Sequence, residues 1–258
     1  SAVDSVLDMF VSIFNYFAIS NAEKPADKTF NYGRGKIEAL ASVIEGTIIT
    51  LSGIFLLYQA IKKAYTNEIS QYLNISLTVM IISLIITISL VLYLNFVAKK
   101  TNNMVIKADA LHYKTDVYTN VAVLVSLVLV NLTGYEIVDA IVGGCIALFI
   151  IYSAFELIKD GVLILLDRAV DDEIVKSIEN IIRTTQKVNT YHLLKTREAG
   201  NQTFVEVHLV FDCLITLMDA HRTSDKIEEQ IKKLDEKRDW LINIHMDPYD
   251  DSQINKEK

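Results

Sequence analysis

The stretch ISQYLNISLTVMIISLIITISLVLYLNFVA, residues 69–98, determines the class of this protein, because its thirty residues include no charged side chain. At 1.5 Å per residue, a helix of this length exceeds the roughly 30 Å hydrocarbon core of a bilayer. Glu68 precedes the stretch and Lys99 follows it. We therefore predict a membrane-spanning helix between these two charges.

Four further apolar segments flank this one and predict a membrane domain of five spans. They are Ser1 to Ser20, Ile37 to Ile61, Met104 to Leu132 and Ile137 to Ile158. Each contains acidic residues, which are costly within a bilayer and therefore mark functional positions.

The average composition is 51% apolar and 22% charged with a mean hydropathy of +0.30, but the charged residues are unevenly distributed along the chain. Residues 169–258 hold 18 acidic and 13 basic side chains, whereas the first 168 residues hold only 14 and 12. We therefore expect a membrane domain over 1–168 and a soluble domain over 169–258. This composition excludes a disordered, collagen-like or repeat-array chain.

Charge and cysteine content restrict the partners. A net charge of -7 without a basic cluster argues against nucleic acid. Cys145 and Cys213 lie in different halves of the chain, so neither a disulfide framework nor a thiolate zinc cluster is expected. Any metal must be bound by histidine and carboxylate.

Lysine and arginine in the connections predict the orientation. Residues 21–36 hold four of them and 98–107 hold three, whereas 62–72 hold two and 133–138 hold none. The positive-inside rule places the first and third connections, and the C-terminal domain, in the cytoplasm. The first span would then begin at the outer face, so we expect one further span upstream, six in all.

From Asp171 the pattern predicts a small α+β domain of α-β-β-α-β order. An amphipathic helix comes first, followed by strands over 190–197 and 203–211, a charged helix over 218–234 and a strand over 241–247. The two helices should cover one face of the sheet.

Two pairs of polar residues at helical spacing predict a metal site within the membrane. Asp4 and Asp8 are four residues apart, as are His112 and Asp116. Three carboxylates and one imidazole suit Zn²⁺, and could also hold Cd²⁺, Fe²⁺ or Mn²⁺. A single acid could simply lie near an interface, but four unused polar groups in lipid would cost roughly 2.5 kcal/mol or more per charge.

The remaining four histidines, His192, His208, His221 and His245, all fall in the soluble domain. His208 lies on the polar face of its strand, opposite Val207 and Leu209, and His245 shares the polar face of the last strand with Asp247. One such histidine is usually a solvated side chain. Several of them with an acid predict a second metal site.

Two acids within the spans have open interpretations. Glu45 could face the transport pathway, or could hydrogen-bond a serine or threonine of a neighbouring helix. Asp109, near the cytoplasmic boundary, could attract incoming cations or lie in water.

The motifs together resemble the cation diffusion facilitators, most closely their bacterial zinc and ferrous-iron efflux members. Five stretches carry the resemblance: Asp4-Ser5-Val6-Leu7-Asp8, Gly33-Arg34-Gly35-Lys36, Ala108-Asp109-Ala110-Leu111-His112-Tyr113-Lys114-Thr115-Asp116, Leu165-Leu166-Asp167-Arg168 and Ile244-His245-Met246-Asp247-Pro248. They occur in the family's order and cover essentially the whole chain.

The resemblance implies six spans and a homodimer with metallochaperone-like cytoplasmic domains. It implies that Asp4, Asp8, His112 and Asp116 form the transport site, and that His192, His208, His221, His245 and Asp247 form cytoplasmic zinc sites at the dimer contact. It also implies a hinge in which Lys36 pairs with Asp167; without the family, both would be ordinary membrane-flanking charges.

One loop departs from the family pattern. Close relatives have a further metal site after their second span, made by one aspartate and two histidines. The matching positions here are Asp27, Phe30 and Arg34. Phenylalanine cannot ligate and arginine repels a cation, so we predict that this loop binds no metal.

We therefore predict a secondary transporter rather than an enzyme: a proton-coupled exporter of divalent cations, zinc first, in a bacterial inner membrane. The ligands bind protons as well as metal, so the two compete. A membrane-anchored metal sensor is the alternative, although an anchor has no use for buried charge. An intramembrane hydrolase using His112 lacks a recognisable nucleophile motif.

Overall fold

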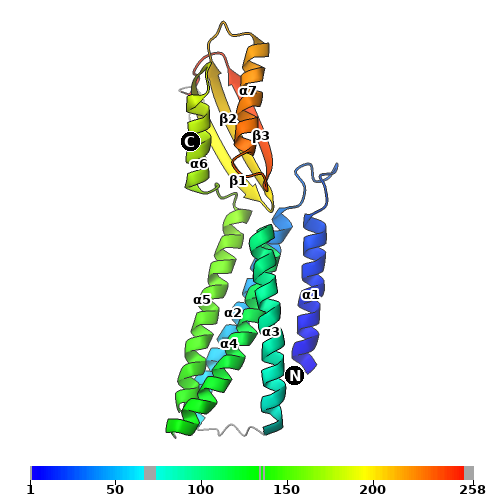
Figure 1. The fold of residues 1–258 in the computed structure, drawn as a ribbon, viewed down its shortest axis with the longest axis vertical. Coiled ribbons are helices and arrows are strands. Elements are labelled where there is room, and N and C mark those ends of the chain that lie inside the picture. The colour runs from blue at the N-terminus through cyan, green and yellow to red at the C-terminus, as the bar shows by residue number, and fades with distance from the viewer. Residues whose placement is uncertain (1, 67–73, 134, 136, 253–258) are drawn as a thin grey trace. The chain divides into compact units, whose positions relative to one another are not determined.

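The computed structural model describes residues 2–66, 74–133, 135 and 137–252 (Figure 1). The chain divides into two compact units, Ser1–Val162 and Leu163–Lys258. The division lies six residues before the predicted boundary. We describe each unit by itself.

The first unit consists of long helices joined by connections in its described part. Its helices are α1 (Ala2–Ala22), α2 (Lys36–Thr66), α3 (Asn74–Thr101), α4 (Met104–Thr133) and α5 (Ile137–Leu165). Four of them contain described segments long and apolar enough to cross a membrane: Lys36–Tyr65, Leu84–Thr101, Met104–Val130 and Ile137–Leu165. The predicted helical membrane domain is confirmed, and α1 matches the predicted first segment.

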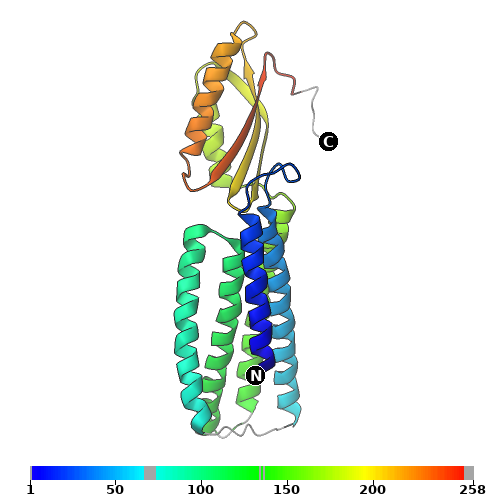
Figure 2. The same ribbon diagram turned by 90° about the vertical axis from the view of Figure 1, so that its right-hand side faces the viewer.

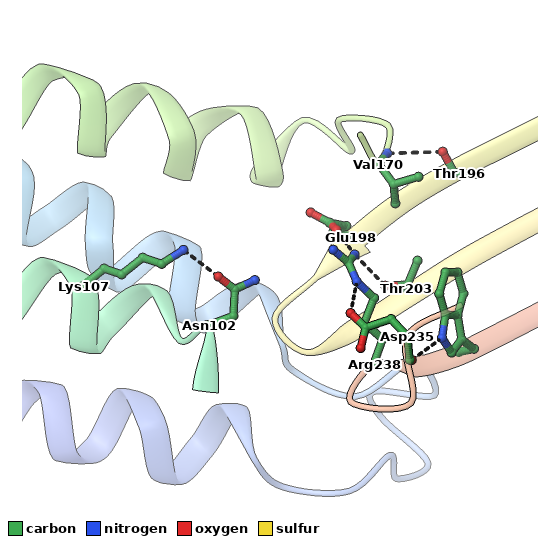
Figure 3. A network of polar contacts seen from close by, with 9 residues as sticks. Asn102, Lys107, Val170, Thr196, Glu198, Thr203, Asp235 and Arg238 are labelled. Carbon is green, nitrogen blue, oxygen red and sulfur yellow. Dashed lines mark hydrogen bonds and ion pairs between the residues drawn. The ribbon is translucent and has the colours of Figure 1, made fainter. Parts of the chain in front are cut away.

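A tight connection joins α3 to α4. Asn102 takes a left-handed conformation with φ 53° and accepts a hydrogen bond of 2.7 Å from Lys107 Nζ (Figure 3). The next residue caps α4, because Asn103 Oδ1 accepts the backbone N–H groups of Val105 and Ile106 at 2.9 and 3.2 Å. Asparagine suits both tasks, so the chain reverses within two residues.

Small residues bring α2 and α5 into close contact. A Cβ atom added to Gly46 would lie 2.8 Å from Ile158 Cγ1, and one added to Gly161 would lie 2.7 Å from Val43 Cγ2. Buried Ile49, Ile150 and Ala154 pack along the same seam. Glycine at such positions lets two membrane helices approach, which increases their packing contact.

The second unit has the predicted α-β-β-α-β order, so the α+β domain is confirmed. Its elements are α6 (Asp172–Thr184), β1 (Val188–Ala199), β2 (Gln202–Phe211), α7 (Leu217–Lys232) and β3 (Asp239–Asp247). The sheet order is β1-β2-β3, with β1 antiparallel and β3 parallel to β2. The strands are longer than predicted, because alternation fades at strand ends before the hydrogen bonding does.

Helices α6 and α7 cover one face of this sheet (Figures 1 and 2). The buried core between the layers contains Ile178, Ile182, Val205, Val207, Leu209, Phe211, Ala220, Ile227, Ile231 and Trp240. The β2 residues in this set include Val207 and Leu209, which were predicted to lie opposite His208. Alternation along the strands consequently places the intervening polar residues on the opposite face.

A polar network fixes the turn that leads into β3 (Figure 3). Arg238 pairs with Glu198 and also donates through Nε to Asp235 Oδ2 at 3.1 Å. Trp240 Nε1 donates to the backbone carbonyl of Asp235 at 2.9 Å. The network connects the turn to β1, which fixes where β3 begins. Nearby, Val170 donates its N–H to Thr196 Oγ1 of β1 at 3.2 Å (Figure 3).

Candidate metal centres

Three strands bring a histidine and aspartate cluster together on the face of the sheet that the helices leave uncovered. The members are His192 of β1, His208 of β2, Asp247 at the end of β3 and Asp251 just beyond it. One ligand atom from each lies within 4.8 Å of every other. Two imidazole nitrogens and two carboxylate oxygens match the ligand types and number of a tetrahedral zinc site.

Strand register explains why these side chains meet. His192 pairs with His208 across β1 and β2, and His208 pairs with His245 across β2 and β3. The register of β1 shifts between His192 and Lys195, where Leu193 has a left-handed φ of 53°. This bulge allows Tyr191 and Leu194 to pack against the core while His192 points to the other face.

Asp247 is the centre of the cluster. Its Oδ2 lies 2.9 Å from His208 Nδ1 and 3.2 Å from His192 Nε2, and its Oδ1 lies 3.0 Å from His245 Nε2. The Asp247 side chain is 8% exposed. A buried carboxylate that contacts three imidazoles can bridge cations or hold the rings in position for a metal.

The His192 ring is largely buried and, within the described part of the chain, lacks the hydrogen bonds that its two nitrogens can form. Its side chain is 10% exposed, and both ring nitrogens are buried without a hydrogen-bond partner among the described residues. Its Nε2 nevertheless lies 3.2 Å from oxygens of both Asp247 and Asp251. A buried ring nitrogen facing two carboxylates is well placed to ligate a cation, which would satisfy all three groups.

Asp251 is a member that the sequence pattern did not reveal. It follows the last strand, where neither alternation nor helical spacing indicates the direction of a side chain. The turn that positions it depends on Asp250, whose Oδ1 accepts the Ser252 N–H at 3.0 Å. Hydrogen bonds from the Ser252 side chain and backbone lower the pKa of Asp250. An acidic pair after Pro248 was the only available signal.

The other predicted cytoplasmic ligands differ in their surroundings. His245 is 65% exposed, and its ring centroid is 4.5 Å from that of His208, so it borders the cluster. His221 lies on α7 with a 63% exposed side chain, and its Nδ1 is 3.5 Å from Asp225 Oδ1. The described residues therefore place His245 beside the cluster, while His221 belongs to a helix that covers the opposite face.

The predicted membrane quartet is divided between α1 and α4. His112 and Asp116 lie one turn apart on α4, and both are half-buried. Asp4 and Asp8 lie on α1, and their side chains are outside the described residues. A hydrogen bond of 3.3 Å from Asn15 Nδ2 to Asp109 Oδ1 connects the two helices. The quartet itself stays a prediction.

The loop between α1 and α2 is organised around Asp27. Its Oδ1 accepts the N–H groups of Thr29 and Phe30 at 2.8 and 2.9 Å, and its Oδ2 accepts Arg34 Nη2 at 2.5 Å. The Phe30 and Thr29 backbone donors, with Arg34, lower the pKa of Asp27. The Arg34 guanidinium also stacks 4.2 Å from the Phe30 ring centroid. An arginine cation thus occupies the position beside this carboxylate.

The two predicted hinge residues lie in different units. Lys36 begins α2 in the first unit. Asp167, in the turn after α5, has a φ of 59° and accepts a hydrogen bond of 3.1 Å from Arg197 Nη1. The pairing of Lys36 with Asp167 stays a prediction.

Comparison with known proteins accounts for nearly the whole chain. Residues 1–166 match the cation efflux transmembrane domain, and residues 170–249 match the cytoplasmic domain of cation efflux proteins. The cation-efflux pump FieF of Serratia proteamaculans is 32% identical over 246 residues, covering 95% of this chain and 81% of that protein. FieF of Yersinia enterocolitica is 34% identical over the same shares.

Among solved structures, the metal-bound C-terminal domain of the CzcD transporter from Thermotoga maritima is similar to part of the chain. It is 23% identical, has a TM-score of 0.28, and covers 30% of this chain and 87% of that chain.

Proposed function

Because this chain belongs to the cation diffusion facilitator family, and is therefore a multi-pass membrane transporter that exports divalent metal cations, we propose that it exports Zn²⁺ in exchange for protons. The transported ion binds Asp4, Asp8, His112 and Asp116 within the membrane. The cytoplasmic domains join two chains into a dimer. A bacterial inner membrane is the proposed location.

The observation that carries this proposal is the contact between α1 and α4. Asn15 and Asp109 are hydrogen-bonded, and α1 and α4 run in opposite directions (Figure 1). Position 8 is seven residues before Asn15, and position 116 is seven residues after Asp109. Seven residues are nearly two full turns, so both positions return to the contacting faces at the same depth. This register supports a shared site.

The ligand types support zinc as the leading substrate. A histidine among three aspartates favours borderline Zn²⁺ over the harder Mn²⁺, which prefers oxygen ligands alone. The aspartates and histidine must be deprotonated to bind a cation. Binding from the cytoplasm therefore releases protons, and protons that enter from outside lower the affinity. Helix pairs then alternate the access to the site.

The cytoplasmic cluster is proposed to hold resident zinc rather than transported zinc. His192, His208, Asp247 and Asp251 provide two nitrogen and two oxygen ligands close together, and bound zinc would neutralise the two carboxylates there. His245 adjoins them, and His221 is proposed to act with a second chain. Zinc that binds the associated form preferentially would strengthen dimerisation.

A comparison of Asp116→Asn with Asp160→Asn in sealed vesicles tests the transport site. Asp116 is half-buried on α4, whereas Asp160 is an exposed acid near the end of α5. Zinc flux should be lost in the first variant and kept in the second, while both remain dimers by size-exclusion chromatography. Flux at the intact rate in Asp116→Asn would refute the site, and a lack of flux in the intact protein would favour the sensor.

A further inference from the structure

A second polar cluster lies within the membrane helices, apart from the proposed transport ligands. Asn15 of α1 donates through Nδ2 to Glu45 Oε2 of α2 at 3.2 Å and to Asp109 Oδ1 of α4 at 3.3 Å. Glu45 is 1% exposed and Asn15 is 5% exposed. One side-chain amide thus holds two carboxyl groups from two other helices. The partner of Glu45 is therefore an asparagine, not the serine or threonine that the sequence suggests as one alternative to a place on the pathway.

The cluster has more acceptors than donors. Glu45 Oε1 and Asn15 Oδ1 are both buried, and neither has a hydrogen-bond partner among the described residues. Both are oxygen atoms, so what they lack is an electropositive partner. The amide of Asn15 already directs its hydrogens to the two carboxyl groups, and no other donor of the described residues reaches Glu45. A proton on a carboxyl oxygen would provide the missing donor.

The two acids lack a lysine or arginine partner among the described residues. Within the part of the chain that the structure describes, neither Glu45 nor Asp109 forms an ion pair with lysine or arginine. The groups that face Glu45 are the neutral Asn15 from α1 and Asp109 from α4, with His112 one turn further along α4. Two carboxylates close together in an apolar environment favour a state in which one of them is protonated.

The cluster lies between a buried apolar layer and the proposed transport ligand His112. Ala18, Ala41 and Val105 form a buried apolar layer one turn away on the same three helices. The end of α5 leads into the cytoplasmic domain. Because α4 runs in the opposite direction to α5, the start of α4 lies on the cytoplasmic side. The apolar layer is therefore on that side of the cluster. His112, three residues after Asp109, is on the other side.

We propose that Glu45 and Asp109 share one exchangeable proton, which leaves when a divalent cation binds the transport site. The positive charge of the cation favours the ionised pair, and the proton passes to cytoplasmic water when the apolar layer opens. On the return, a proton from outside recombines with the pair after the cation has left. This inference rests on the proposed function, and it adds one proton carrier to those among the metal ligands.

The test counts the protons released when Zn²⁺ binds the purified full-length chain in weakly buffered detergent solution, using a pH-sensitive dye. Glu45→Gln should release up to one proton fewer per transport-site zinc than the intact chain. Glu38→Gln is the matched control, because Glu38 lies on the same helix, is 8% exposed, and accepts a hydrogen bond from the Met104 backbone. It should release as many protons as the intact chain.

Asp109→Asn provides a second, independent variant if Glu45→Gln does not fold, and it should lower the proton count in the same way. An unchanged count in a folded Glu45→Gln or Asp109→Asn protein would overturn the inference. So would the loss of one whole zinc equivalent with unchanged protons per zinc, because the cluster would then be a metal site. If the intact chain releases no protons on zinc binding, the proposed proton exchange itself fails.

Discussion

Asp247→Asn should have a large effect on zinc binding by the cytoplasmic domain, because one carboxylate contacts three histidines. Its oxygens lie 2.9 to 3.2 Å from His192, His208 and His245. Asparagine preserves the shape but removes the charge and one acceptor oxygen. Losing even an outer-shell partner of a metal ligand costs roughly 10–100-fold in affinity, so we expect at least the upper figure here, about 2.7 kcal/mol.

This loss of affinity should reduce the thermal stabilisation that zinc gives to the domain. Zinc at about 100 times the intact dissociation constant should stabilise the intact domain by about 2.7 kcal/mol, and the 100-fold weaker variant by only about 0.4 kcal/mol. In a domain of up to about 100 residues, 1 kcal/mol shifts the Tm by roughly 4–8 °C. Zinc should therefore raise the Tm by about 10–20 °C in the intact domain and about 2–3 °C in the variant.

Thermal unfolding of residues 163–258 followed by circular dichroism is a suitable assay, because this unit has its own hydrophobic core. Asp250→Asn is the matched control, since asparagine can still accept the Ser252 N–H and Asp250 is outside the cluster. Its zinc-induced shift should equal that of the intact domain. Equal shifts in Asp247→Asn and the intact domain would show that this carboxylate does not bind the metal.

Three further predictions concern the membrane domain. His112→Asp should increase Mn²⁺ or Fe²⁺ transport relative to Zn²⁺ and change its pH dependence; an unaltered preference and pH profile in vesicle uptake would contradict this. Gly161→Ala should destabilise the protein by about 1–3 kcal/mol, because the new methyl meets α2 at 2.7 Å. Among the described residues, a methyl group added at Gly144 meets nothing within 4 Å, so equal thermal unfolding of the two variants in detergent would refute this reasoning. Zinc-edge anomalous scattering should show no peak at Asp27. Its lowered pKa keeps the carboxylate ionised and bonded to Arg34 until the pH falls through that lowered value; a peak with ordinary coordination distances would disprove this.

Much of this fold could be predicted from the sequence, because the residue pattern within each element determines it. A charge-free run of thirty residues can satisfy its backbone in lipid only as a helix, so α3 (Asn74–Thr101) could be predicted from length alone. Residues 69–73 of the predicted span lie outside the described residues. Alternation in β2 likewise predicted which side chains enter the core, and it placed His208 on the opposite face. These predictions needed only the periodicity of one element at a time.

The parts that could not be predicted depend on contacts between elements. The bulge at Leu193 rotates His192 toward its partners, and no residue pattern indicates that bulge. Asp251 reaches the cluster through a turn, where side-chain direction has no period. The partner of Glu45 is Asn15 rather than a serine or threonine, because the rotation of three packed helices decides which polar groups meet.

The most direct test of the central claim is the simultaneous measurement of zinc and proton movement in sealed vesicles that contain the intact protein. Fluorescent indicators would follow Zn²⁺ and pH inside the same vesicles, starting from equal pH on both sides. We predict that zinc entering the vesicles drives protons out, and that an acidic interior accelerates zinc uptake. Zinc entry with no proton movement and no response to the imposed pH gradient would contradict cation and proton exchange.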